Sequence, residues 1–132
     1  MRCYIIFYFN KNSKYSNVRV SINGESYDSK KEAKRHQELL LLQKSGQIKD
    51  LERQVKFELI PVQREPDTIG KRGGIHKGKV IENGVNYVAD FVYTDCHSGY
   101  KIVEDSKGMR TKDYIIKRKL MLWIHGIRIV ET

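Results

Sequence analysis

The sequence predicts an α/β protein with one central mixed sheet flanked by helices and an extra β-hairpin at the N-terminus. Short apolar runs bounded by turn residues indicate strands. Two longer segments begin with helix-capping residues and carry apolar residues at helical spacing. After the hairpin, the predicted order is helix, strand, strand, strand, helix, strand, which is expected of helices packed on a sheet.

Length and composition indicate a single domain, residues 1–132, with a core of its own. With 39% hydrophobic and 31% charged residues, the composition is that of a soluble globular protein. The apolar run Leu39–Leu42 is far too short for a membrane span, so we expect no membrane partner. The aromatic start, Met1–Phe9, lacks a signal-peptide cleavage site, and Cys3 and Cys96 set no disulfide framework, which predicts a cytoplasmic protein.

The net charge of +9 and a pI near 9.6 point to a polyanionic partner. A basic surface that serves only solubility remains the alternative.

In the N-terminal extension, residues 1–24, the segments Tyr4–Phe9 and Val18–Ile22 predict a hairpin that ends at the turn Asn23-Gly24. A helix then opens at Ser29, where Glu32 completes a capping-box pattern, and Gly46 is a plausible end for it. Residues 48–61 contain a strand, clearest over residues 55–60.

Residues 62–85 are expected to form a long, mobile, basic loop with at most a short strand at its end. A loop of this length in a compact domain is usually functional or disordered. The residues that suggest it are Pro66, Gly70, Gly73, Gly74 and Gly78, with Arg64, Lys71, Arg72, Lys77 and Lys79 between them.

Two further strands, over residues 86–93 and 100–103, flank a turn-like segment and carry the most informative side chains. Asp90 lies in the first of these strands, and Asp105 and Lys107 follow the second. Alternate residues of a strand point to the same face, so Asp105 and Lys107 should project side by side while Glu104 faces away. Two strand-borne carboxylates beside a lysine suggest a nuclease that binds a divalent cation.

Hydrolysis of a phosphodiester requires an activated water and stabilisation of charge on the phosphate. Mg²⁺ supplies much of both when carboxylates hold it and leave positions open. Asp90 and Asp105 are suitable ligands, and the backbone carbonyl of Ser106 is a third candidate. Lys107 would orient or deprotonate the water, or neutralise developing charge. The alternative for Asp105 and Lys107 is a surface ion pair at a strand end.

A second helix is predicted from Thr111, a capping residue, to Gly126, and residues 127–130 form a last strand. The apolar residues that recur at helical spacing, and that we expect to face the core, are Ile116, Leu120, Trp123 and Ile124. Glu32 has two interpretations, as a capping-box residue that bonds the N–H of Ser29 or as a metal ligand that reaches from its helix to the sheet.

Three runs, residues 27–33, 87–93 and 103–108, resemble the PD-(D/E)XK nuclease superfamily, and more narrowly a small group of phage and prophage proteins that form a domain of unknown function. The resemblance covers roughly residues 18–130. It implies a restriction-endonuclease-like αβββαβ core.

By this resemblance, Glu32 matches the acidic residue of the first core helix, and Asp90 matches the first half of the motif, with Ala89 where proline is typical. Asp105 and Lys107 match the second half. Gln54 lies just before the strand where some relatives have a polar active-site residue. The residues expected to contact DNA are Arg72, Lys77, Arg110, Thr111, Lys112, Tyr114 and Lys117; the alternative for the basic ones is an ordinary solvated surface.

The resemblance implies a Mg²⁺-dependent DNA endonuclease of phage type, with Mn²⁺ as substitute, that acts in recombination, repair or genome processing in a bacterial host. Small basic nucleases of this fold that resolve branched DNA are homodimers, which implies a homodimer and, as a refinement, Holliday-junction resolution. A restriction-like or nicking enzyme fits the same residues. The rival class is a non-catalytic DNA-binding or phage regulatory protein on the same fold.

Overall fold

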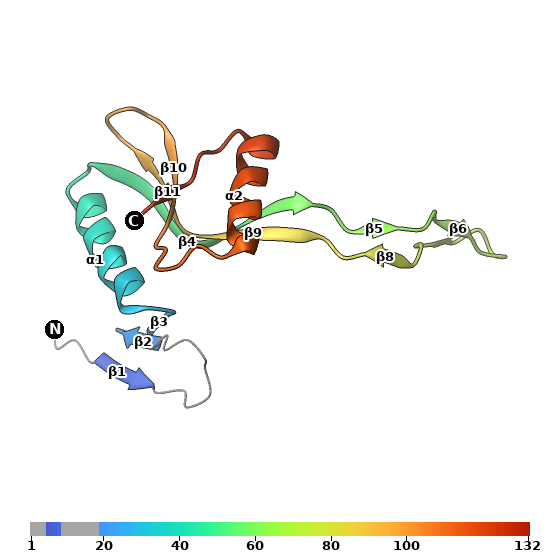
Figure 1. Cartoon of the computed structure of the whole chain (residues 1–132). Coiled ribbons are helices and arrows are strands. Elements are labelled where there is room, and N and C mark those ends of the chain that lie inside the picture. Colours follow the sequence, from blue (N-terminus) through green and yellow to red (C-terminus); the bar gives the residue numbers. More distant parts are fainter. Residues whose placement is uncertain (1–4, 9–18) are drawn as a thin grey trace.

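The computed structural model describes residues 5–8 and 19–132, with side chains from Arg19 onward. In this part the protein has mixed α/β architecture, with a body built on a central sheet and a long two-stranded extension (Figure 1). None of the helices in the described ranges is long and apolar enough to cross a membrane.

The central sheet has the strand order β11-β10-β9-β4. The long strands β4 (Ile48–Ile60) and β9 (Val85–Asp95) pair antiparallel, and β9 pairs antiparallel with β10 (Lys101–Asp105). The last strand, β11 (Val130–Glu131), runs parallel to β10. This arrangement confirms the predicted mixed sheet and the predicted order of its elements.

The helices α1 (Lys30–Lys44) and α2 (Lys112–His125) pack on opposite faces of the sheet. Leu39 of α1 packs with Phe91, whereas Met121 of α2 packs with Val103 in a separate cluster. The next residue of β10, Glu104, contacts α1 through Arg35. Neighbouring residues of one strand therefore reach different helices, because successive side chains of a strand point to opposite faces.

Both helices begin and end where the sequence predicts. The Ser29 hydroxyl accepts the N–H of Glu32 at 3.1 Å, and the Thr111 hydroxyl accepts the N–H of Tyr114 at 3.2 Å. At the other end, α1 is followed by Gly46 with φ of 81°, and α2 closes on Gly126 with φ of 66°. Glycine adopts this left-handed conformation without a Cβ clash, which is why it ends helices.

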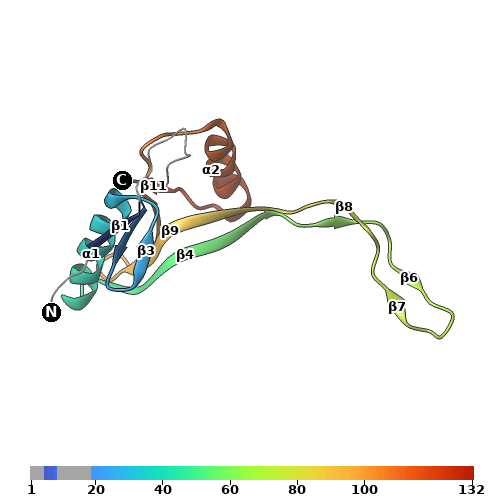
Figure 2. The ribbon, with the colours of Figure 1, turned by 90° about the horizontal axis from the view of Figure 1, so that it is seen from below.

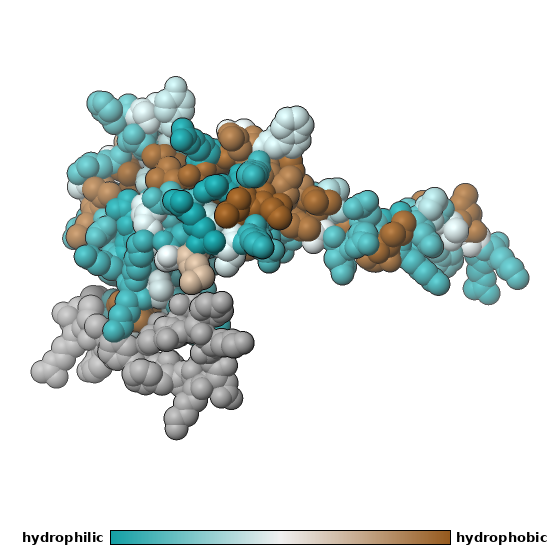
Figure 3. Space-filling view, viewed as in Figure 1, coloured by the Kyte–Doolittle hydropathy of each residue, from teal (hydrophilic) through white to brown (hydrophobic). Residues whose placement is uncertain are grey.

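The predicted core face of α2 is confirmed for Leu120, which packs against the core, and is wrong for the other three residues. Trp123 is 86% exposed, Ile116 is 57% exposed and Ile124 is 44% exposed, while the buried residues of the helix are Tyr114 and Met121. Helical spacing reveals an apolar stripe, but it does not reveal which stripe packs on the sheet. Hydrophobic side chains accordingly gather on the surface around α2 and the base of the extension (Figure 3).

The N-terminal strands form a small sheet of their own, in the order β1-β2-β3. The antiparallel pairing of β1 (Ile5–Tyr8) with β2 (Arg19–Ile22) confirms the predicted hairpin, and β3 (Glu25–Tyr27) adds a third strand. The predicted ends at Tyr4, Phe9 and Val18 lie outside the described residues.

This small sheet is not detached from the body. Val20 of β2 and Tyr27 of β3 are buried against Ala33 of α1. The turn between β2 and β3 is formed by Asn23 and Gly24, both with positive φ, as their sequence predicts.

Residues 62–84, called the arm below, form a paired ribbon, whereas residues 62–85 were predicted as a loop with a short strand at its end. The strands β5 (Gln63–Arg64) and β8 (Val80–Glu82) pair antiparallel, and so do β6 (Thr68–Ile69) and β7 (Ile75–His76). The arm continues the β4–β9 hairpin and stands away from the body in both views (Figures 1 and 2). Its glycines and proline suggested a loop, and strands exposed on both faces lack the apolar alternation that reveals pairing.

Candidate functional site

A cleft of about 630 Å³ lies where the start of α1 meets β9 and the segment after β10. It brings together Glu32, Asp90, Ser106 and Lys107, which the sequence predicted as site residues. Asp105 does not line the cleft, because its side chain is fully buried next to it. The complete lining is Asp28, Ser29, Lys31, Glu32, Asp90, Ser106, Lys107, Gly108, Met109 and Thr111.

Asp105 and Lys107 project side by side, as strand geometry predicts. The Lys107 ammonium lies 3.2 Å from Oδ2 of Asp105, and the hydroxyl of Tyr87 donates to the same oxygen at 2.6 Å. The other oxygen of Asp105, Oδ1, is buried and has no hydrogen-bond partner among the described residues. Buried carboxylate oxygens are normally satisfied, so this unpaired oxygen is a donor atom available to a ligand such as a cation.

Lys107 itself is held in place from a second side. Its ammonium lies 4.8 Å from the centre of the Tyr114 ring, within range of a cation–π contact. Tyr114 is 6% exposed and donates its hydroxyl to Oε1 of Glu131 at 2.9 Å. The expectation that Tyr114 faces DNA is therefore wrong, because the residue is part of the core and supports Lys107.

Asp90 lies in the electrostatic field of Asp105. Burial, followed by contact with the Asp105 carboxyl, raises the pKa of Asp90 to about 7, although the backbone N–H of Ser106 donates to Asp90 Oδ2 at 2.8 Å and acts in the opposite direction. Glu32 adds a smaller repulsion. Like charges this close disfavour joint ionisation, and a bound cation would relieve the repulsion.

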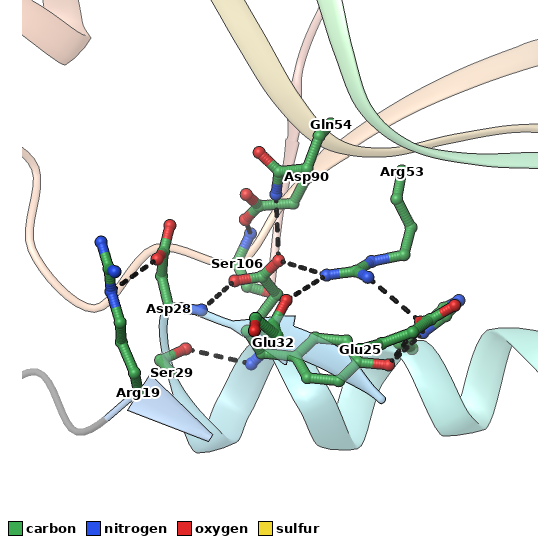
Figure 4. A network of polar contacts seen from close by, with 12 residues as sticks. Arg19, Glu25, Asp28, Ser29, Glu32, Arg53, Gln54, Asp90 and Ser106 are labelled. Carbon is green, nitrogen blue, oxygen red and sulfur yellow. Dashed lines mark hydrogen bonds and ion pairs between the residues drawn. The ribbon is translucent and has the colours of Figure 1, made fainter. Parts of the chain in front are cut away.

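Glu32 has its predicted capping role in a modified form, and its side chain also reaches the cleft. One carboxylate oxygen accepts the N–H of Asp28 at 3.1 Å, so the expected bond to the N–H of Ser29 is replaced by one to the preceding residue. The other oxygen accepts from Nε2 of Gln54 at 3.0 Å and lies 3.4 Å from Nη2 of Arg53 (Figure 4). The side chain is thus a helix cap that also forms part of the cleft wall.

The sheet is irregular where Gln54 and Asp90 face each other. Arg53 pairs with Phe91 and Val55 pairs with Ala89, which places Gln54 opposite Asp90. Gln54 has φ of 52°, a conformation that non-glycine residues seldom adopt. Such backbone strain concentrates at functional sites. The sequence placed Gln54 just before this strand, whereas it lies within β4 and contacts Glu32.

Sequence reasoning missed Arg53, which connects the cleft to the N-terminal sheet. Its guanidinium contacts Glu25 at 3.1 Å and Glu32 at 3.4 Å, and it lies 4.1 Å from the centre of the Tyr27 ring (Figure 4). Tyr87, the partner of Asp105, was also missed. Arg53 belongs to no sequence motif, and Tyr87 begins the run 87–93 without a predicted role, because each acts through a partner that is distant along the chain.

The acidic residues meet at one cleft without forming a ready-made metal cluster. Within residues 5–8 and 19–132, no group of three or more Asp, Glu, His or Cys side chains is close enough to hold a metal ion. Glu32 is engaged by Arg53 and Gln54. The donors that fit a hard cation are therefore Asp90 and Asp105, two carboxylates with one unsatisfied buried oxygen.

A second, basic cavity of about 540 Å³ lies beside α2 and β11. Arg110, predicted to bind DNA, bonds Oε2 of Glu131 through Nε at 2.7 Å, and Arg118 bonds Oε1 at 2.8 Å. The Arg118 hydrogen bond is the main cause that lowers the pKa of Glu131 to about 2. Arg128 and Lys119 also line this cavity, which therefore carries an excess of positive charge.

The remaining residues predicted to bind DNA are spread over the molecule. Thr111 lines the acidic cleft, Lys112 is exposed at the start of α2, and Lys117 is half-buried on the same helix. Arg72 and Lys77 are exposed in the arm, on either side of β7, and not beside the cleft.

Comparison with known proteins identifies one family. Residues 12–125 match the family described as "Protein of unknown function (DUF1064)". Neither the curated proteins nor the solved structures gave a match to the chain. Since the match extends over most of its length, the chain belongs to the DUF1064 family.

Proposed function

We propose that the chain is a divalent-metal-dependent DNA endonuclease with a restriction-endonuclease-like αβββαβ core of the PD-(D/E)XK type. One observation carries the proposal. At the edge of the cleft, the Lys107 ammonium lies 3.2 Å from the Asp105 carboxylate, which has an unpaired buried oxygen and repels the neighbouring Asp90. A lysine and two mutually repelling carboxylates form the charge pattern that phosphodiester hydrolysis with a hard cation requires.

The residues proposed to hold Mg²⁺, or Mn²⁺ in its place, are Asp90, Asp105, the carbonyl of Ser106 and, after release from Arg53, Glu32. When bound, the ion would supply Lewis-acid activation of water and stabilisation of charge on the phosphate. The chain's own groups position the site. Lys107 places a positive charge where the phosphate develops negative charge, and its fixed location follows from its contact with Asp105.

The proposed substrate is DNA, and branched DNA is the proposed refinement. The net charge of +9 and the basic cavity beside α2 support a polyanionic substrate that approaches the same side of the sheet as α2. We propose that a second copy of the chain completes a homodimer, supported by the exposed apolar residues Ile116, Trp123 and Ile124 on one helix. Expression from a phage in the cytoplasm of a bacterial host belongs to the same proposal.

A cleavage assay tests the activity. Supercoiled, linear and four-way-junction DNA are incubated with Mg²⁺, Mn²⁺ or EDTA. We expect metal-dependent cleavage that disappears in Asp105→Asn and Lys107→Ala. The matched controls Asp113→Asn and Lys101→Ala remove the same charges at exposed positions outside the cleft, and they should cleave like the wild type. Cleavage that persists in EDTA, or in Asp105→Asn, contradicts the proposal.

A non-catalytic DNA-binding or phage regulatory protein is the second candidate. The observation that favours it is that the described residues contain no three-ligand cluster. In addition, Lys107 and Tyr87 both engage one oxygen of Asp105, an arrangement that a purely structural carboxylate would also show. Binding of DNA without cleavage under every metal tried would establish this candidate.

A further inference from the structure

The arm has no role in the proposed chemistry, yet its composition and shape are distinctive. It extends away from the body in both ribbon views, so it contributes little to the core (Figures 1 and 2). An extended chain advances at most about 3.3 to 3.6 Å per residue. The twelve residues from Ile60 to Arg72 can therefore carry the tip at most about 40 Å beyond the end of the central sheet.

The tip of the arm, residues 68–79, is strongly basic. It contains no Asp or Glu. All its cationic side chains are exposed, and none forms an ion pair within the part of the chain that the structure describes. Concentrated positive charge without acidic partners matches a phosphate backbone. These cations are Lys71, Arg72, Lys77 and Lys79.

The same tip exposes a pair of isoleucines. Ile69 of β6 pairs directly with Ile75 of β7, and the two residues are 80% and 76% exposed. Two large aliphatic side chains at the end of a thin ribbon have nothing in the described structure to pack on. In the major groove, apolar side chains contact the methyl group of thymine, while cations beside them contact phosphates.

The arm is held in a defined shape, as a binding element requires. Gly78 passes so close to Glu65 that a Cβ on it would lie 1.8 Å from the Glu65 carbonyl oxygen. The N–H of Gly78 donates to Oδ1 of Asp67 at 2.9 Å, and Nη1 of Arg64 donates to the Gly78 carbonyl at 3.1 Å. These contacts join the β5–β8 and β6–β7 pairs, so less ordering is needed when the tip binds.

We propose that the arm is a DNA-gripping element whose tip binds duplex DNA beyond the end of the central sheet, away from the acidic cleft, with the Ile69–Ile75 pair in a groove and the cations on phosphates. This inference rests on the proposed function only in taking DNA as the substrate. A two-stranded ribbon fits the width of the major groove, about 12 Å. A second copy of this chain is disfavoured at the tip, because the four cations there would meet a chain of net charge +9, whereas the homodimer proposed above uses apolar residues of α2.

Binding to a labelled 30-base-pair duplex in EDTA, measured by fluorescence anisotropy over a range of salt concentrations, tests the proposal. The basic variant is Lys71→Ala/Arg72→Ala/Lys77→Ala. We expect it to bind at least about tenfold more weakly than the wild type, with a salt slope lower by about 2 to 3. The matched control removes three exposed cations from the body, and its affinity for the duplex should fall less than about threefold. Its substitutions are Lys44→Ala, Lys49→Ala and Lys101→Ala.

A second variant, Ile69→Ser/Ile75→Ser, removes the apolar pair and leaves every charge. We expect weaker binding with an unchanged salt slope, because no phosphate contact is lost. All five arm residues are exposed, so the urea unfolding midpoints should stay at the wild-type value.

Equal affinity of the basic variant and the control overturns the proposal. The proposal is also overturned if the wild type is a dimer and either arm variant is a monomer in sedimentation without DNA, because the tip would then be the contact with a second copy. Since the binding assay requires no hydrolysis, a protein that binds through the arm and never cleaves refutes the proposed nuclease alone. A nuclease whose basic variant binds DNA like the wild type refutes the arm alone.

Discussion

Replacing Asp90 by asparagine should stabilise the metal-free protein at neutral pH while it abolishes cleavage. Burial and the nearby Asp105 carboxyl raise the pKa of Asp90 to about 7 from its ordinary value of 3.8. The folded protein therefore holds the Asp90 proton more tightly than the unfolded chain. Asparagine keeps an oxygen that can accept the N–H of Ser106, which now bonds Asp90 at 2.8 Å, so only the charge is lost.

The sign and size of the effect follow from this shift. With a raised pKa, the contribution of Asp90 to stability is greatest below pH 4 and falls as the pH rises from about 4 to about 7. A shift of about 3 units corresponds to about 4 kcal/mol as an upper limit. The carboxyl is partly exposed and shares the repulsion with Asp105, so we expect a gain of ~1–2 kcal/mol for Asp90→Asn at pH 8.

Urea unfolding in EDTA at several values between pH 4 and pH 8 measures the effect. The wild type should lose stability relative to Asp90→Asn as the pH rises, and the two should converge near pH 4. The control Asp113→Asn changes an exposed carboxylate and should follow the wild type. Addition of Mg²⁺ at about ten times its dissociation constant should raise the stability of the wild type by ~1.4 kcal/mol and leave Asp90→Asn unchanged. If Asp90→Asn is less stable than the wild type at pH 8, the inferred repulsion is refuted.

Three further predictions concern other parts of the body. Glu104→Ala should lower the free energy of unfolding by about 3 kcal/mol in urea titrations, because Arg35 keeps only its exposed partner Glu38 and the Tyr93 hydroxyl loses its buried acceptor. A loss below about 1 kcal/mol would contradict this. Trp123→Ser should change stability by less than about 0.5 kcal/mol, since the side chain is 86% exposed. The same substitution should convert a dimer into a monomer in sedimentation. If the sedimenting mass is unchanged, α2 is not part of the dimer interface. Tyr87→Phe removes the hydroxyl that donates to Asp105 and should reduce the cleavage rate while DNA affinity in EDTA stays at the wild-type value; equal reduction of both would show that Tyr87 supports the fold only.

Local signals in the sequence predicted much of the fold. Ser29 and Thr111 cap the helices, and Gly46 and Gly126 follow them, because caps depend on a few adjacent residues. The side-by-side placement of Asp105 and Lys107 also follows from local geometry, the two-residue repeat of a strand. Features set by neighbours along the chain were therefore predictable.

Features set by distant partners were not predictable. The apolar stripe around Trp123 is real, but its exposure depends on how α2 rotates against the sheet. The pairing of Ile69 with Ile75 depends on a partner strand, since neither strand has a buried face to produce alternation. Arg53 joins Glu25 and Glu32 across three elements, and no spacing in the sequence encodes that meeting.

Glu104 and Asp105 point to opposite faces of the sheet, which has a consequence for strand β10. Glu104 is buried against Arg35 and Tyr93, whereas Asp105 is buried against Tyr87 on the reverse side. Sliding this strand by one position would turn each carboxylate toward the other's surroundings and separate the Arg35 guanidinium from its buried partner, Glu104. Two adjacent acids with different partners therefore fix the register of β10 in the sheet. This register also fixes the position of Lys107, the proposed catalytic lysine, which follows the strand.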